Sequence, residues 1–81
     1  MEKEITIKST TGLHASLAAK VVQTASKYSV EIELHYGSKV VDLKSILALM
    51  SLAVPYGQNV KIIARGTRAG EAIKAVSSIL G

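Results

Sequence analysis

The spacing of apolar residues changes repeatedly along the 81 residues, and this alternation limits the possible folds more than any other feature. Ile5 and Ile7 alternate with polar residues at a period of two, which is typical of a half-buried strand. After a break at Thr10-Thr11-Gly12, the apolar residues of positions 16–28 recur at helical spacing, with lysine and glutamine on the other side. The chain therefore predicts a strand followed by a helix from about Ser16 to Tyr28.

The next segment predicts a β-hairpin. Residues 30–36 alternate apolar and polar side chains, and Gly37-Ser38 follows as a two-residue turn signal before the short strand Lys39–Asp42.

A second, short helix is expected immediately afterwards. Ser45 is a favourable N-cap for residues 46–52, which are apolar on all sides, and Pro55 and Gly57 are expected to stop this helix.

The last third of the chain repeats the pattern of strand and helix. Residues 60–65 alternate as a fourth strand ending at Gly66, and residues 72–80 carry the apolar stripe of a closing helix. The order β-α-β-β-α-β-α predicts an α+β open-faced β-sandwich, with a four-stranded antiparallel sheet and three helices on one face. No linker or repeat interrupts the pattern, so we interpret residues 1–81 as a single domain.

Composition removes several classes of protein. The chain has no cysteine, which excludes disulfide frameworks, thiolate nucleophiles and cysteine-bound metals and favours a reducing cytoplasm. The longest stretch without a charge, residues 45–60, is interrupted by polar residues and proline, so we expect no membrane insertion. The net charge of +4 predicts attraction to an acidic partner.

An RNA-binding sheet is the main alternative of a different class, because β-α-β-β-α-β is also the order of the RRM fold. That fold stacks bases on aromatic residues of its central strands. Here the strands offer only Tyr36, and Lys39–Asp42 has no aromatic residue. We therefore expect no direct binding of nucleic acid.

His14 is the candidate for chemistry. It stands in a turn after Gly12, directly before a predicted helix whose first N–H groups have no internal partners and can bind an anion. A neutral imidazole is a nucleophile that could accept a phosphoryl group there. From the local sequence alone, the favoured interpretation of His14 is a polar residue near an N-cap, because short motifs have many false positives. His35 lies on the polar face of a strand, where we expect a solvated side chain without a role.

Three motifs decide between these readings: Thr11-Gly12-Leu13-His14-Ala15, the segment Val22–Tyr28, and the segment Leu43–Leu52. Together they resemble the HPr family of phosphocarrier proteins of the bacterial phosphotransferase system, over essentially the whole chain. The resemblance implies that His14 accepts a phosphoryl group from enzyme I, which takes it from phosphoenolpyruvate, and passes it to enzyme IIA. It implies no cofactor or metal and no enzyme activity of its own; the chain would be a substrate of partner enzymes.

The resemblance also implies a regulatory site at Ser45. In Gram-positive relatives, HPr kinase/phosphorylase phosphorylates the serine that begins the second helix, and the product joins a catabolite control repressor. A phosphate on Ser45 would meet the free amides and the dipole of its own helix. An unmodified N-cap serine explains Ser45 equally well from its local sequence.

The second helix is also the predicted partner surface. Ile46, Leu47 and Met50 cover more than one helical face, so some of them must be exposed, and Leu47 with Met50 is the favoured pair. The resemblance adds the first helix, with Lys20, to the partner-binding surface, and implies a monomer.

The chain departs from the family directly after His14-Ala15, where Ser16 and Leu17 replace the usual Arg-Pro. A guanidinium could form charge-assisted hydrogen bonds of about 1.5–3 kcal/mol with a phosphoryl group, whereas Ser16 offers one neutral hydroxyl. Leu17 also lacks the fixed φ of proline. Two hypotheses stay open: a slower carrier that binds phosphate through Ser16 and the amides up to Leu17, or a divergent regulatory protein with weak or no carrier activity.

Overall fold

The computed structural model describes all residues, 1–81, and contains the seven elements in the predicted order. These elements are β1 (Glu2–Thr6), α1 (Ala15–Ala25), β2 (Glu31–Tyr36), β3 (Lys39–Asp42), α2 (Ile46–Leu52), β4 (Asn59–Arg65) and α3 (Ala69–Leu80). The predicted fold class, an antiparallel sheet covered by three helices, is confirmed.

The four strands form one sheet in the order β1-β4-β2-β3, and every neighbouring pair is antiparallel. The last strand therefore lies inside the sheet, between the first strand and the hairpin. The start of the chain is fixed to β4, because the Met1 amino group donates to the Ala64 carbonyl at 3.0 Å and the Ala64 N–H donates back to Met1 at 2.8 Å. β1 and β3 are left as the two edges.

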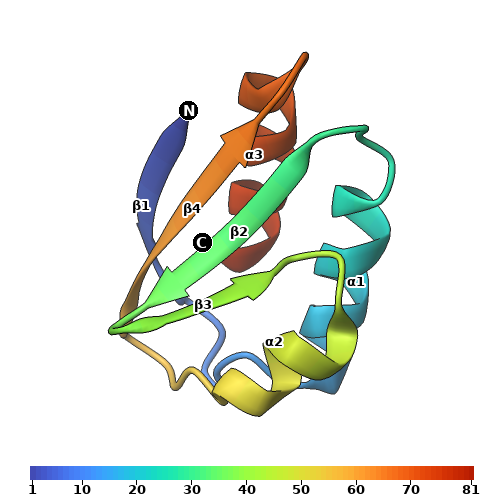
Figure 1. Cartoon of the computed structure of the whole chain (residues 1–81). Coiled ribbons are helices and arrows are strands. Elements are labelled where there is room, and N and C mark those ends of the chain that lie inside the picture. The colour runs from blue at the N-terminus through green and yellow to red at the C-terminus, as the bar shows by residue number, and fades with distance from the viewer.

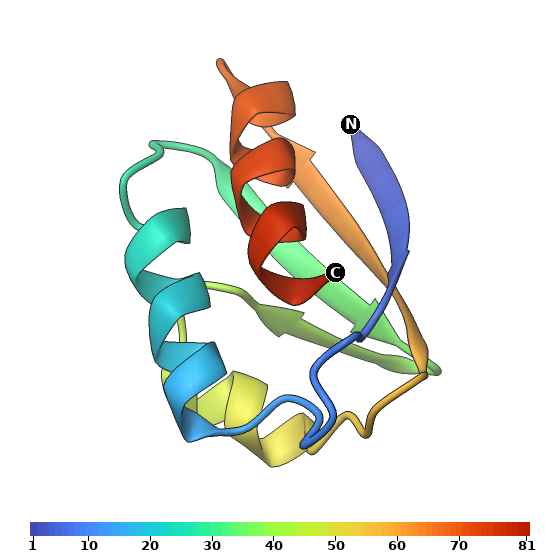
Figure 2. The same ribbon diagram turned by 180° about the vertical axis from the view of Figure 1, so that it is seen from behind.

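All three helices cover one face of the sheet, and the other face is open (Figures 1 and 2). The inward residues of β2 and β4, among them Ile32, Leu34, Val60 and Ile62, are buried against the helices. The outward face carries charged side chains, as the alternation of apolar and polar residues predicts. None of the three helices combines the length and apolar character needed to cross a bilayer.

The end of one helix differs from the prediction. α1 stops at Ala25 and not near Tyr28, because the N–H groups of Lys27 and Tyr28 bond to carbonyls three residues earlier and tighten the last turn. α2 covers Ile46–Leu52 as predicted, and Ala53, which adopts a left-handed conformation with φ of 50°, ends it before Pro55 is reached.

Candidate functional site

The loop that leads to His14 is fixed by a close approach between two backbones. Gly12 has φ of 71°, and a Cβ atom at this position would lie 2.6 Å from the Val54 carbonyl oxygen. The next residue, Leu13, is buried and donates its N–H to the same oxygen at 2.8 Å. Only glycine satisfies both the positive φ and the short distance. The turn is therefore attached to the segment that follows α2.

His14 is the N-cap residue of α1, one position before the first helical residue. Its backbone is extended, with φ of −98° and ψ of 175°, and its carbonyl accepts from the Ala18 N–H at 2.9 Å. The imidazole is exposed and makes no capping hydrogen bond with the helix. The helix begins at Ala15, one residue before the predicted start, which places the ring directly at the entrance to the first turn.

The first turn of α1 presents free hydrogen-bond donors beside His14. No carbonyl or side chain of the protein accepts from the N–H groups of Ala15, Ser16 and Leu17. The turn also contains no acidic residue, so nothing opposes the positive end of the helix dipole. This arrangement of amides can hold an anionic group next to the imidazole.

Ser16 and Leu17 occupy the second and third helical positions and differ in what they can offer. Ser16 is exposed, so its hydroxyl and its N–H are both accessible. Leu17 is half-buried and packs against the core, so only its main-chain N–H is suited to an anion. Apart from this N–H, Leu17 is a packing residue.

Ser45 begins α2 with the same role in the backbone and a different use of its side chain. Its hydroxyl accepts a hydrogen bond from the Ala48 N–H at 3.3 Å, which confirms the predicted N-cap. The residue is half-buried. The start of α2 is therefore closed by its own cap.

An exposed apolar surface follows on α2 and in the segment after it. Leu47 is 79% exposed and Met50 43%, so the predicted exposure of this pair is confirmed. Ile46 is exposed as well, at 38%. Tyr56, 60% exposed, extends the surface and was missed by the sequence reading. Its position between Pro55 and Gly57 is the signal that could have identified it, because turns and loops usually lie at the surface.

The segments that carry these residues lie at one end of the molecule, where the start of α1 lies beside α2 (Figures 1 and 2). The bond from Leu13 to Val54 connects the His14 turn to the segment before Tyr56. Lys20 is exposed on α1, the same helix that His14 caps. The fold thus brings His14, Ser45 and the exposed side chains of α2 onto neighbouring elements.

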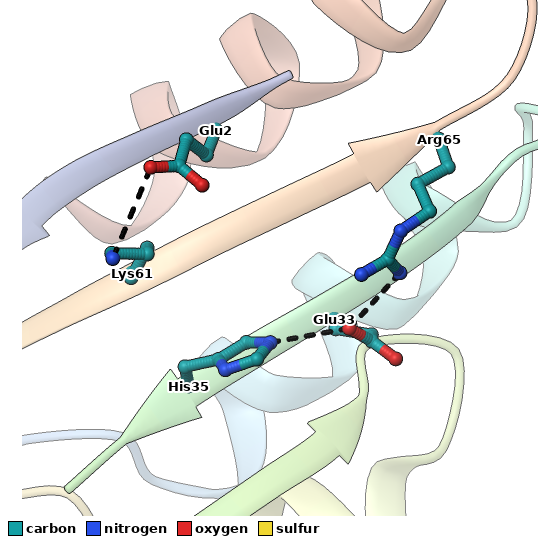
Figure 3. A network of polar contacts seen from close by, with 5 residues as sticks. All are labelled: Glu2, Glu33, His35, Lys61 and Arg65. Carbon is teal, nitrogen blue, oxygen red and sulfur yellow. Dashed lines mark hydrogen bonds and ion pairs between the residues drawn. The ribbon is translucent and has the colours of Figure 1, made fainter.

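The second histidine lies elsewhere, on the open face of the sheet (Figure 3). His35 is half-buried, and its Nε2 lies 3.1 Å from the Glu33 carboxylate, so the expected free, solvated side chain is wrong. Arg65 also donates to Glu33 at 3.1 Å. The hydrogen bonds from His35 and then Arg65 hold the pKa of Glu33 below its usual range. Glu33 and His35 are two residues apart on one face of β2, and Arg65 reaches Glu33 from β4. Neither contact was predicted from the sequence.

Comparison with known proteins gives a consistent result. The family model described as "PTS HPr component phosphorylation site" matches residues 1–81. An HPr from Thermoanaerobacter tengcongensis is 48% identical with a TM-score of 0.94, covering 99% of this chain and 90% of that one. The phosphocarrier protein HPr from Bacillus anthracis is 32% identical with a TM-score of 0.95, covering 100% and 96%.

A third similar structure is the catabolite repression protein Crh from Bacillus subtilis, described as an intertwined dimer with a swapped domain. It is 36% identical with a TM-score of 0.79, covering 95% of this chain and 88% of that one.

Proposed function

Because this chain belongs to the HPr family of the phosphotransferase system, we propose that it carries a phosphoryl group on His14. The group would come from phosphorylated enzyme I and pass to enzyme IIA. The observation that carries the proposal is the exposed imidazole at the N-cap of α1, beside three N–H groups without acceptors. Family membership of the whole chain supports a phosphocarrier or regulatory role, and the geometry favours the carrier.

The transfer would follow the chemistry of an imidazole. The unprotonated ring nitrogen forms the P–N bond while the bond from phosphorus to the donor breaks, and its electron pair stays on the donor. The phosphoryl oxygens would accept from the N–H groups of Ala15, Ser16 and Leu17 and from the Ser16 hydroxyl. These neutral donors replace the guanidinium of the family motif, so we expect transfer at a reduced rate.

The test is incubation with enzyme I and phosphoenolpyruvate, followed by measurement of acid-labile phosphate on the protein. Wild type should be labelled and His14→Ala should not. His35→Gln is the matched control, because it removes the only other imidazole from a different face of the protein, and its label should equal that of wild type. An unlabelled wild type, or label that persists in His14→Ala, would reject a carrier function of His14.

A second function, regulation through Ser45, is favoured by the half-buried cap serine at the start of α2 and by the likeness to Crh. We propose that HPr kinase/phosphorylase phosphorylates Ser45 and that the product binds a catabolite control repressor. Incubation with this kinase and ATP should label wild type but not Ser45→Ala. Ser51→Ala, which removes an exposed hydroxyl from the same helix, should keep the label. Label on Ser45→Ala would move the regulatory site elsewhere.

We also propose that partners contact the exposed apolar side chains Ile46, Leu47 and Met50, with Lys20 beside them on α1. Leu47→Ser should slow the transfer from enzyme I roughly tenfold, as truncation of an exposed anchor residue does. Val40→Ser is the matched control, because Val40 is 52% exposed but lies on the β3 edge strand. Equal rates for both variants would argue against this surface.

The protein would act in the cytoplasm, where its partners use phosphoenolpyruvate, and as a monomer, because its core closes within one chain. Sedimentation equilibrium tests the second point. A dimer would contradict it, and dimers of both Crh and an HPr occur among the similar structures.

A further inference from the structure

A cavity of about 440 Å³ opens between β1 and the C-terminal half of α3. Lys3 and the following β1 residues line one side, and Lys74, Ser77 and Ser78 line the other, with Lys8 beyond the end of the strand. Figure 2 shows α3 running alongside β1, and the Lys8 N–H donates to the Leu80 carbonyl at 3.2 Å where the two elements meet. None of the residues around His14 takes part in this cavity.

Ser77 is the feature of the cavity that most requires an explanation. It is the one buried polar residue, 5% exposed, and its hydroxyl has no hydrogen-bond partner. The other serines in helix interiors behave differently: Ser51 and Ser78 each donate to a carbonyl three residues earlier. A buried hydroxyl without a partner is unfavourable, so a group that reaches it through the cavity would satisfy a donor that the protein leaves free.

The charge of the cavity indicates an anion. Lys3, Lys8 and Lys74 form no ion pair, whereas Lys61, Arg65 and Arg68 are each paired with a glutamate. One acidic residue, Glu4, also lines the cavity. Strand alternation places Glu4 on the face of β1 opposite Lys3, where its register partner is Lys61. Three unpaired ammonium groups therefore surround the space beside Ser77.

The free edge of β1 adds neutral donors and acceptors. The N–H and C=O groups of Met1 and Ile7 form hydrogen bonds with β4 and the turn before it. Successive residues of a strand point these groups to opposite sides, so the N–H and C=O groups of Glu4 point away from β4, along the free edge of the sheet. The cavity is also in the size range of small-molecule sites and exceeds what a phosphate ion alone would occupy. A ligand with both a phosphate and hydroxyl groups fits this set.

We propose that the cavity between β1 and α3 binds a small polyol phosphate monoester, with its phosphate among Lys3, Lys8, Lys74 and the Ser77 hydroxyl. This site is separate from His14, so the proposal does not rest on phosphoryl transfer. It would let the protein respond to a phosphorylated metabolite at a site that shares no lining residue with the proposed partner surface.

The test is an NMR titration of the full chain with glycerol 3-phosphate at physiological ionic strength, following the amide signals. We expect saturable shifts at Lys8, Ser77 and Ser78, weaker binding of inorganic phosphate and none of glycerol. Shifts confined to Ala15, Ser16 and Leu17, or shifts that do not saturate, would overturn the proposal. Equal affinity for inorganic phosphate or for malonate would overturn the assignment of a phosphate monoester.

Variants distinguish binding at this cavity from attraction to the net positive charge of the protein. Lys74→Gln should weaken binding about fivefold, because it removes a charge-assisted hydrogen bond. Lys39→Gln removes the same charge from the opposite edge strand and should leave the affinity unchanged. Ser77→Ala should weaken binding roughly threefold without lowering the melting temperature of the free protein, because its hydroxyl has no partner to lose. Equal weakening by Lys74→Gln and Lys39→Gln would show attraction to net charge alone.

Discussion

The starts of α1 and α2 have similar backbones and differ in what their N-cap side chains do. His14 and Ser45 are both extended, yet the Ser45 hydroxyl caps the Ala48 N–H while the His14 ring caps nothing. α1 thus gives up the stabilisation of a cap, which is typically about 1 kcal/mol, and keeps its first amides accessible. The start of α1 is left open for an incoming anion beside the His14 ring, whereas the start of α2 is capped by its own unmodified serine.

The largest effect should come from a substitution that disturbs the loop leading to the open start of α1. Gly12→Ala should lower the free energy of unfolding by about 3 kcal/mol, because the new Cβ combines a positive φ with a contact of 2.6 Å to the Val54 carbonyl. Chemical denaturation measures this loss. Phosphorylation from enzyme I should fall with it, since the His14 turn must move.

Gly57→Ala is the matched control for this loss. Gly57 also has a positive φ, of 85°, but no atom lies within 4 Å of the added Cβ. Gly57→Ala should lower the free energy of unfolding only by the cost of backbone strain, roughly 1 kcal/mol. Equal losses in the two variants would show that the contact with Val54 contributes nothing.

The second effect concerns the donors at the open start. Ser16→Arg should raise the rate of phosphorylation by enzyme I roughly tenfold, because a guanidinium adds a charge-assisted hydrogen bond to the transferring group. Ser16→Gln supplies a side chain with neutral donors and should stay near the wild-type rate. If the two variants react equally fast, the amides of α1 already suffice and the missing arginine is not the limit.

The third effect tests the closed start. Ser45→Ala should lower the free energy of unfolding by about 1 kcal/mol and the melting temperature by roughly 5 °C, because the Ala48 N–H loses its acceptor. Thermal unfolding followed by circular dichroism measures the shift.

The equivalent change at the open start should have the opposite sign. His14→Ser adds a capping hydroxyl where none exists, so its melting temperature should rise by a similar amount while its phosphorylation is lost. A His14→Ser variant that melts below wild type would contradict the difference between the two starts.

The sequence was most informative where a pattern is local. The order of elements, the Gly37-Ser38 turn, the Ser45 cap and the exposure of Leu47 and Met50 all follow from spacing and turn chemistry, and the structure confirms them. The resemblance to the family, which the family model bears out, was identified from three sequence motifs. The spacing of apolar residues alone does not reveal these motifs.

Contacts between distant segments were not predicted. The place of β4 inside the sheet, the approach of Gly12 to Val54 and the bond from Arg65 to Glu33 join residues from different elements. A single sequence does not show which residues of two distant segments lie opposite each other. The end of α1 was missed because its apolar pattern continues past Ala25, whereas the N–H groups of Lys27 and Tyr28 bond to carbonyls three residues earlier.

The smallest effect links the two helix starts through the end of α2. Ala53 has φ of 50°, which an L-residue adopts at a cost of about 1–2 kcal/mol, while glycine adopts it freely but loses more entropy on folding. Ala53→Gly should therefore raise the free energy of unfolding by roughly 0.5–1 kcal/mol. Because the next residue, Val54, accepts from Leu13, a firmer end of α2 should leave the His14 turn in place and the rate of phosphorylation unchanged. A rate that changes together with stability would mean that the strain at Ala53 is transmitted to the open start of α1.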